Sequence, residues 1–442
     1  MKKIHHILSA LLTLAVTLGL QSCLKDQADV FDNASSLRLQ EYLDKTQKIL
    51  VDAPYGWAFD IYPERTQAYG GYAFTLKFDR EKCKVRSVLD ASREDESYYK
   101  MTSEVGPAIT FDTYNPLMHY FSNPSSARFQ ALKGDFEFVV DSVSENLIKV
   151  HGYRTKNVMY LRKLDMPAAN YINKVDSFSA DFTPTGLWSF KGKVNGTDVQ
   201  GELDASELKL TYNSGQKEET TAIAFTDRGV RTYRPLQIGG TTFGELTFNA
   251  SDSTYRAKGA NNEEIILKAE QPKWFPAYAN AAGKYTLEAV YSLNNTDYNV
   301  ELDVDLKLTA DYKGYEMEGA LLGYNIRLTF DRKEEAMIVA PQQIGRFPDG
   351  NVLMLTTFST SAGRLTTSPS ACFSLKWEKA ANAYVFRPKG EWGYPSSGWF
   401  LGVYDSQWSF LGNAKALKVP NAYLFGRAYE RLDQLLKLKR RQ

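Results

Sequence analysis

The chain has 442 residues, and its 53 Lys and Arg residues nearly balance its 52 Asp and Glu residues. The formal net charge of +1 provides no broad positive field for nucleic acid. Hydrophobic residues make up 43% and charged residues 24%, which is typical of a folded globular protein and excludes a disordered one. The 27 Tyr and 24 Phe residues favour β-strands.

The N-terminus is typical of a lipoprotein signal peptide. Lys2 and Lys3 precede an apolar run, residues 7–20, that is too short for a spanning helix and ends in the sequence LQSC. We therefore expect residues 1–22 to be cleaved and Cys23 to become a lipidated first residue that anchors the chain in the outer membrane. An ordinary secretory signal with an incidental cysteine is the alternative.

Residues 23–34 are expected to form a short charged tether. Asp26 and Asp29 resemble in part the acidic export signal that some surface lipoproteins of the Bacteroidota carry after the cysteine. A solvated spacer with no sorting role is the alternative, in which case the protein faces the periplasm. No later apolar run reaches the length needed to cross a bilayer, so the lipid is the only membrane anchor expected.

Residues 35–165 are expected to form a first β unit. It opens with a helix over residues 35–51, where leucines recur at helical spacing, and from residue 55 the apolar period changes to two. The strands expected are 57–61, 72–78, 84–88, 108–112, 116–121, 135–140, 147–151 and 157–161. Short antiparallel strands of this kind predict an all-β meander that closes into a barrel or curved sandwich.

A second β unit, residues 183–270, is expected after a linker over residues 165–182. Three of its segments echo the first unit in the same order, and we interpret them as a structural repeat, with convergent strand patterning as the alternative. The paired segments are 186–190 with 55–59, 221–236 with 107–121, and 244–267 with 134–161.

A third β-rich unit, residues 283–442, is expected after a Pro-containing boundary at 271–282. Its expected strands are 284–292, 298–309, 323–331, 336–340, 352–358, 372–377 and 383–388. An amphipathic helix over residues 422–438 is expected to end the chain, followed by a basic tail.

Four blocks in fixed order carry a resemblance to a known family: GWAFDIYP, GGYAFTLKFD, GPAITFDTYNPLMHYF and GDFEFVVDSVSENLIKVHG. Over residues 23–267 the chain resembles the Bacteroidota lipoprotein family of unknown function DUF4302. The resemblance implies a lipoprotein that works beside an outer-membrane nutrient importer of the starch-utilisation type. It brings no catalytic residues with it.

The residue types that usually carry catalysis or bind metal are sparse. Glu94 to Glu96 form the densest acidic run, which we interpret as a solvated loop. His119 and His151 are the only histidines after cleavage, and neither has metal ligands at a suitable spacing, so neither a metal nor a cofactor is expected. Cys83 and Cys372 lie in distant regions and are expected to be two free thiols, with a disulfide between them as the alternative.

The C-terminal region is the one place where aromatic rings concentrate among Gly and Ser residues. The candidate ligand-binding residues are Trp392, Tyr394, Trp399, Tyr404 and Trp408. Exposed rings bind the apolar faces of sugars or peptide side chains, although a core role is favoured for most of them. Trp399 and Tyr404 differ in sequence parity, so a single strand that carries both is expected to turn them to opposite faces.

These features lead to one function hypothesis and two rivals. The favoured hypothesis is a non-enzymatic, lipid-anchored accessory protein of a nutrient-uptake system that captures a glycan- or peptide-type ligand. The first rival is a glycan- or peptide-acting hydrolase whose carboxylates meet only in the fold. The second is a structural or assembly lipoprotein of an importer complex.

Overall fold

The computed structural model describes residues 35–104, 106–125, 128–390 and 392–441. The signal peptide, Cys23 and the tether therefore lie outside the described residues. The described chain divides into two compact units, the first formed by residues 35–177 with 224–227 and the second by residues 178–223 with 228–441. None of the described helices is long and apolar enough to cross a membrane.

The first unit is a helix followed by one nine-stranded antiparallel sheet. Its elements are α2 (Ser35–Val51), β1 (Trp57–Ile61), β2 (Tyr72–Phe78), β3 (Lys82–Ser87), β4 (Asp90–Tyr98), β5 (Lys100–Thr102), β6 (Ala108–Thr110), β7 (Glu137–Val143), β8 (Leu147–Gly152) and β9 (Val158–Lys163). The strand order is β4-β3-β2-β1-β9-β8-β7-β6-β5. Its two outermost strands, β4 and β5, are joined in the chain through the buried Tyr99 alone. The all-β fold class is confirmed.

Two predictions for the first unit are wrong. Residues 116–121 form turns instead of a strand, because the side chain of Asn115 and the ring of His119 bond to backbone groups of this loop and hold it folded. The acidic run lies on β4 instead of in a loop, where Glu94 pairs with Arg86 at 2.8 Å and Glu96 with Lys82 at 2.9 Å across β3. Neighbouring basic residues on β3 thus make an acidic strand favourable.

The expected linker contains a 15-residue helix, α3 (Ala168–Phe182), followed by the short helix η2 (Thr183–Thr185). Pro167 stands directly before α3, where its fixed φ suits a helix start. Within the first unit, Ile172 and Val175 of this helix pack with Ala58 and Ala73, which face the outer side of β1 and β2. The segment therefore has the helical apolar period of 3.6 residues, which a search for alternation overlooks.

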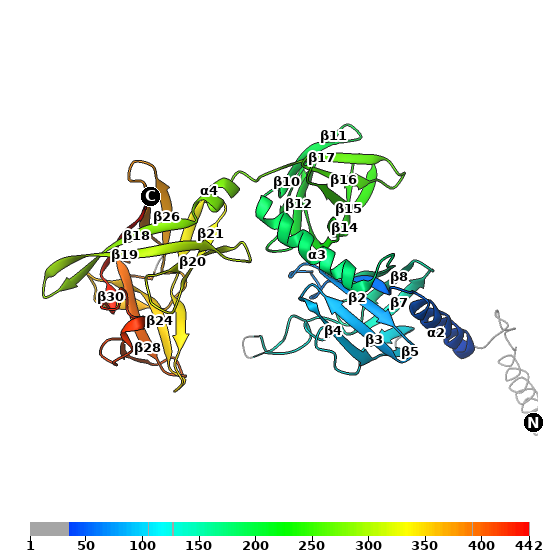
Figure 1. Ribbon diagram of the computed structural model, residues 1–442, viewed down its shortest axis with the longest axis horizontal. Helices are drawn as coiled ribbons and strands as arrows, with labels where there is room; N and C mark the ends of the chain where they lie inside the picture. The colour runs from blue at the N-terminus through cyan, green and yellow to red at the C-terminus, as the bar shows by residue number, and fades with distance from the viewer. Residues whose placement is uncertain (1–34, 105, 126–127, 391, 442) are drawn as a thin grey trace, which may run out of the picture. The chain divides into compact units, whose positions relative to one another are not determined.

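The second unit contains two closed eight-stranded barrels (Figure 1). The first barrel consists of β10 (Ser189–Val194), β11 (Thr197–Asp204), β12 (Lys209–Ser214), β13 (Lys217–Thr226), β14 (Gly229–Ile238), β15 (Thr241–Asn249), β16 (Thr254–Lys258) and β17 (Glu264–Glu270). After α4 (Phe275–Asn280), the second consists of β18 (Gly283–Leu293), β19 (Thr296–Leu308), β20 (Gly314–Glu318), β21 (Ile326–Asp331), β22 (Ala336–Val339), β26 (Cys372–Glu378), β27 (Ala383–Lys389) and β31 (Gln434–Arg440).

A further sheet is inserted within the chain of the second barrel. It is formed by β23 (Gln342–Arg346), β24 (Val352–Ser359), β28 (Gly398–Tyr404) and β29 (Phe410–Asn413), with β25 (Arg364–Thr366) and β30 (Arg431–Leu432) at its sides. The seven strands expected in this region are all present. The expected C-terminal helix is wrong: the segment forms η3 (Asn421–Tyr423), β30 and β31. Closing the barrel between β18 and β27 gives β31 backbone partners on both sides, which overrides helical propensity.

A tryptophan ties the first strand of each echoing segment to the helix before it. Trp57 donates its indole N–H to the carbonyl of Leu50 at 3.0 Å, and Trp188 donates to the carbonyl of Thr183 at 3.2 Å. Both rings are fully buried. Of the three echoes, the first, which contains Trp57 and Trp188, and the last, a three-strand meander, map onto equivalent strands. The middle echo does not, because residues 116–121 are turns and Gly229–Ile238 is a strand.

Candidate functional site

The structure separates the five aromatic candidates into buried and exposed rings. Trp399 is 2% exposed, contacts Phe386 edge-on at 5.6 Å and stacks on Phe425 at 6.0 Å. Tyr404 is also buried, at 6% exposure. Neither ring is accessible to a ligand, so both are core residues of the third β-rich region.

The parity argument for Trp399 and Tyr404 does not yield an exposed face. All but one residue of β28 is buried, because β28 lies inside its sheet and both of its faces are covered. Trp408 is 55% exposed and Tyr394 is 45% exposed. Trp392 contacts Tyr394 edge-on at 5.2 Å, and among the described ring contacts none joins either of these residues to Trp408. The exposed rings therefore do not form one aromatic surface.

The candidate site lies instead on the first barrel of the second unit. A groove of about 630 Å³ lies over the outer face of β10, β11 and β12, and an adjoining hollow of about 460 Å³ shares Lys191, Gln200 and Asn213 with it. Both volumes are within the range of known ligand sites. We call the two together the β10–β12 groove.

The alternation of the strands places polar side chains in the groove and apolar ones inside the barrel. Phe190 on β10, Leu203 on β11 and Tyr212 on β12 are buried inside the barrel. Their immediate neighbours along each strand point outward. Gly201 is required opposite Phe190, because a Cβ at this position would lie 2.4 Å from the ring. The interior is thus filled, and ligand access is from the outside only.

The outward side chains form two rows across the strands. Strand register aligns Lys191 with Gln200, Gln200 with Asn213, and Asn213 with Glu218, which gives the first row. The second row consists of Ser189, Glu202 and Thr211. Side chains in register lie on the same face of a sheet, so each row presents its polar groups side by side.

The segment that follows β17 forms one wall of the groove. Gln271 donates its amide N–H to the carbonyl of Thr185 at 2.9 Å, and Trp274 donates its indole N–H to Glu202 Oε1 at 2.9 Å. These two bonds hold the wall against the barrel. They leave the intervening Lys273 exposed beside the groove.

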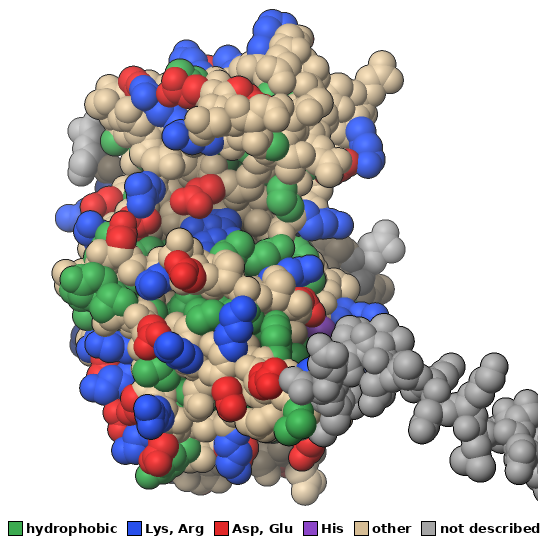
Figure 2. Space-filling view, turned by 90° about the vertical axis from the view of Figure 1, so that its right-hand side faces the viewer, with side chains coloured by type: hydrophobic (Ala, Val, Ile, Leu, Met, Phe, Trp, Pro, Cys, Tyr) green, Lys and Arg blue, Asp and Glu red, His purple; other side chains and the backbone are tan. Residues whose placement is uncertain are grey.

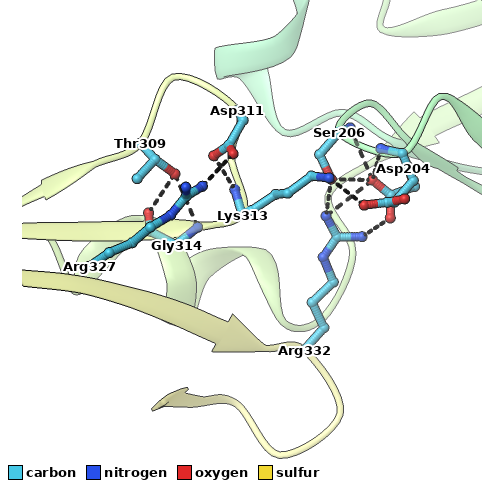
Figure 3. Close-up of polar contacts among 9 residues, drawn as sticks. Asp204, Ser206, Thr309, Asp311, Lys313, Gly314, Arg327 and Arg332 are labelled. Carbon is cyan, nitrogen blue, oxygen red and sulfur yellow. Dashed lines mark hydrogen bonds and ion pairs between the residues drawn. The ribbon is translucent and has the colours of Figure 1, made fainter. Parts of the chain in front are cut away.

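Arg332 closes one end of the groove. Its guanidinium donates to both carboxylate oxygens of Asp204 and to Ser206 Oγ (Figure 3). It also lies over the Trp274 ring at 4.4 Å. Lys313 pairs with Glu207 at 2.5 Å next to it. A planar guanidinium bound bidentately and stacked on a ring is a rigid arrangement, so this end of the groove is well defined.

Two groove carboxyls have shifted pKa values, and both shifts are downward. Burial alone would raise the pKa of Asp204, but hydrogen bonds from Arg332 and Ser206 outweigh burial and lower it. A hydrogen bond from Lys191 is the main cause of the lowered pKa of Glu270. Both groups are therefore ionised hydrogen-bond acceptors at neutral pH, whereas a general acid requires a raised pKa.

Four polar groups at the groove are uncommitted. Among the described residues, the amides of Gln200 and Asn213, the carboxylate of Glu218 and the ammonium group of Lys273 have no hydrogen-bond or ion-pair partner. By contrast, Lys191 is paired with Glu270 at 2.7 Å. Uncommitted groups around a groove are free to bind a ligand without breaking an internal bond.

Sequence reasoning did not find these residues, because β11 and β12 were not predicted. The signal was present in the alternation of residues 197–204, which turns Gln200, Glu202 and Asp204 to one face. Alternation identifies an outward face, but it does not show which outward face is hollowed.

The remaining candidates for reactive chemistry have structural roles. His151 contacts Asp141 at 2.8 Å, and His119 stacks on Phe136 at 4.9 Å. Cys83 is fully buried, which raises the pKa of its thiol, and both Cys83 and Cys372 are free, as expected. No group of three potential metal-ligating side chains occurs among the described residues.

Tandem antiparallel β barrels, each preceded by a helix, with a polar groove on an outer barrel face define the class of this protein. The chain belongs to the family described as "Domain of unknown function (DUF4302)", whose model matches residues 27–250. A second model, DUF4987, also described as a domain of unknown function, matches residues 258–391 and extends over most of the third β-rich region.

Other comparisons add no relative that carries an argument. None of the curated proteins matches the chain. Two solved structures of the Helicobacter pylori beta clamp, in complex with 5-chloroisatin and with carprofen, are 11% and 10% identical, with TM-scores of 0.10 and 0.09. Each alignment covers 73% of this chain and 93% of the clamp. Such low TM-scores do not indicate a shared fold.

Proposed function

We propose that this protein is a lipid-anchored accessory binding protein of a nutrient-uptake system, which captures a glycan- or peptide-type ligand in the β10–β12 groove. The observation that carries the proposal is the pair of uncommitted amides, Gln200 and Asn213, side by side on the groove floor. An amide offers both a donor and an acceptor, which suits the hydroxyl groups of sugars and the peptide groups of a polypeptide.

The location part of the proposal rests on the sequence. The LQSC motif and Cys23 support an outer-membrane anchor, and the partial export signal supports exposure at the cell surface. Acidic and basic side chains are interspersed over the face of the molecule drawn in Figure 2, so no patch of a single sign dominates this face. An importer partner is part of the proposal through the properties that the family resemblance implies.

The structure favours binding over the hydrolase alternative at this groove. A retaining or inverting glycosidase needs one carboxyl whose pKa is raised. The shifted groove carboxyls, Asp204 and Glu270, have lowered pKa values. The alternative of a structural or assembly lipoprotein that binds no ligand does not account for the uncommitted amides of the groove.

Replacing Gln200 and Asn213 together by alanine is expected to weaken ligand binding about tenfold or more, because two hydrogen bonds of about 1 kcal/mol each are lost. Isothermal titration calorimetry with linear neutral hexasaccharides and with pentapeptides measures this. The control is Gln237→Ala, which removes an exposed amide from β14 of the same barrel, away from the groove. Equal loss in the control variant, or no ligand bound by the unaltered protein, would contradict the proposal.

Surface exposure makes a separate prediction. Intact cells treated with an external protease are expected to lose the protein, because an outward-facing lipoprotein is accessible without disrupting the membrane. The readout is immunoblotting of washed cells, with a periplasmic protein as the protected control. Full protection until the outer membrane is permeabilised would place the protein on the periplasmic side.

A further inference from the structure

We propose that the β10–β12 groove binds short peptides with free termini, with the ammonium end at Glu218 and the carboxylate end at Lys273. This inference rests on the proposed binding function and names the ligand class for the same groove. It is carried by the placement of the four uncommitted polar groups relative to one another.

The two uncommitted charges lie on different sides of the groove. Glu218 is on β13, at the end of the row that runs from Lys191 on β10 through Gln200 and Asn213. Lys273 follows β17, and its neighbour Trp274 is bonded to Glu202 on β11. Strands β11 and β13 are two strand intervals apart, so the two charges are separated by on the order of 10–15 Å.

The other charged side chains of the groove have partners within the protein. Lys191 pairs with Glu270 at 2.7 Å, and Lys193 pairs with Asp198 at 2.6 Å. Asp204 is bound by Arg332, and Glu202 accepts the indole N–H of Trp274. Among the described residues that line the groove, Glu218 and Lys273 are the charged side chains without a hydrogen-bond or ion-pair partner, and this combination suits a ligand that carries one charge of each sign.

The two free amides lie between these charges. Gln200 and Asn213 face the same side in adjacent strands and can pair with the N–H and C=O groups of a peptide backbone. An extended chain advances about 3.3–3.6 Å per residue, so the span between the two charges corresponds to about three to four residues. A neutral saccharide would use the amides but would leave both charges unpaired.

The test compares one tetrapeptide in four forms: with free termini, N-acetylated, C-amidated and capped at both ends. Calorimetry at low ionic strength is expected to show that each cap weakens binding about fivefold, the size of an exposed ion pair, and that added salt reduces this difference. Neutral linear hexasaccharides are measured in parallel.

Glu218→Gln is expected to weaken binding of the free peptide about fivefold and to leave binding of the N-acetylated peptide unchanged. Lys273→Gln is expected to weaken binding of the free peptide about fivefold and to leave binding of the C-amidated peptide unchanged. Both side chains are exposed, so melting temperatures are expected to stay constant. Glu145→Gln and Lys379→Gln, two exposed residues outside the groove, serve as matched controls.

Equal affinity for the free and the fully capped peptide would overturn this inference. If the saccharides bind, with dependence on Gln200 and Asn213, and the peptides do not, the peptide inference is wrong but the proposed binding function stands. If neither kind of ligand binds the unaltered protein, both are wrong.

Discussion

Trp399→Ala is expected to lower the free energy of unfolding of the second unit by about 3–5 kcal/mol, the usual cost of removing a buried aromatic side chain. The ring is almost completely buried on β28, where it contacts Phe386 and Phe425. Its removal leaves a cavity in a close-packed region that collapses only in part. Differential scanning calorimetry of the lipid-free protein is expected to show a clear fall in the melting temperature of that unit.

Trp408→Ala is the matched control, since it removes the same type of side chain from an exposed position. Trp408 is 55% exposed in a turn, so its removal is expected to change the unfolding free energy by about 0.5 kcal/mol or less. Unchanged melting of the Trp399→Ala variant, together with lost ligand retention, would show that Trp399 is a binding residue after all. Similar melting changes in both variants would contradict the assigned burial.

Cys23→Ala is expected to release the protein from the membrane fraction completely. Lipidation of this cysteine would add several acyl chains, each stabilising membrane attachment by about 0.8 kcal/mol per buried methylene. The variant loses all of them at once. Fractionation of cells followed by immunoblotting measures the shift.

Metabolic labelling with palmitate provides the direct test of the same anchor. The unaltered protein is expected to incorporate label, and Cys23→Ala is not. Ser22→Ala is a useful control, because it changes the neighbouring residue and retains a small side chain before the cysteine. Absence of label from the unaltered protein would show that the N-terminus is an ordinary secretory signal.

Local patterns in the sequence were sufficient for seven strands of the third β-rich region, namely β18, β19, β21, β22, β24, β26 and β27, and for most strands of the first unit. Alternation with a period of two reports which side chains face inward, and burial of one face is what stabilises a strand. The echo between residues 55–59 and 186–190 correctly paired Trp57 with Trp188, although the segment before Trp188 was expected to be a linker and forms α3. The all-β class followed directly from these local signals.

Local patterns failed where long-range contacts decide the outcome. Residues 434–440 have a pattern compatible with a helix, but barrel closure between β18 and β27 makes them a strand. Trp399 and Tyr404 have opposite parity on β28, yet both are buried because other elements cover both faces of the strand. In both cases the deciding partners are distant in the chain.

The sequence by itself thus determined the all-β class of the fold and part of its strands, and the anchor at Cys23 remains a prediction from the sequence alone. The position of the groove was decided only by the tertiary structure. No strand was expected at Gln200, Asn213 or Glu218, and Lys273 lies in the segment expected to be a domain boundary. Barrel register aligns the first three, and the bond from Trp274 to Glu202 holds the segment that carries Lys273 beside them. A site built from several strands depends on register and curvature, which arise from pairing between distant segments and leave no local pattern.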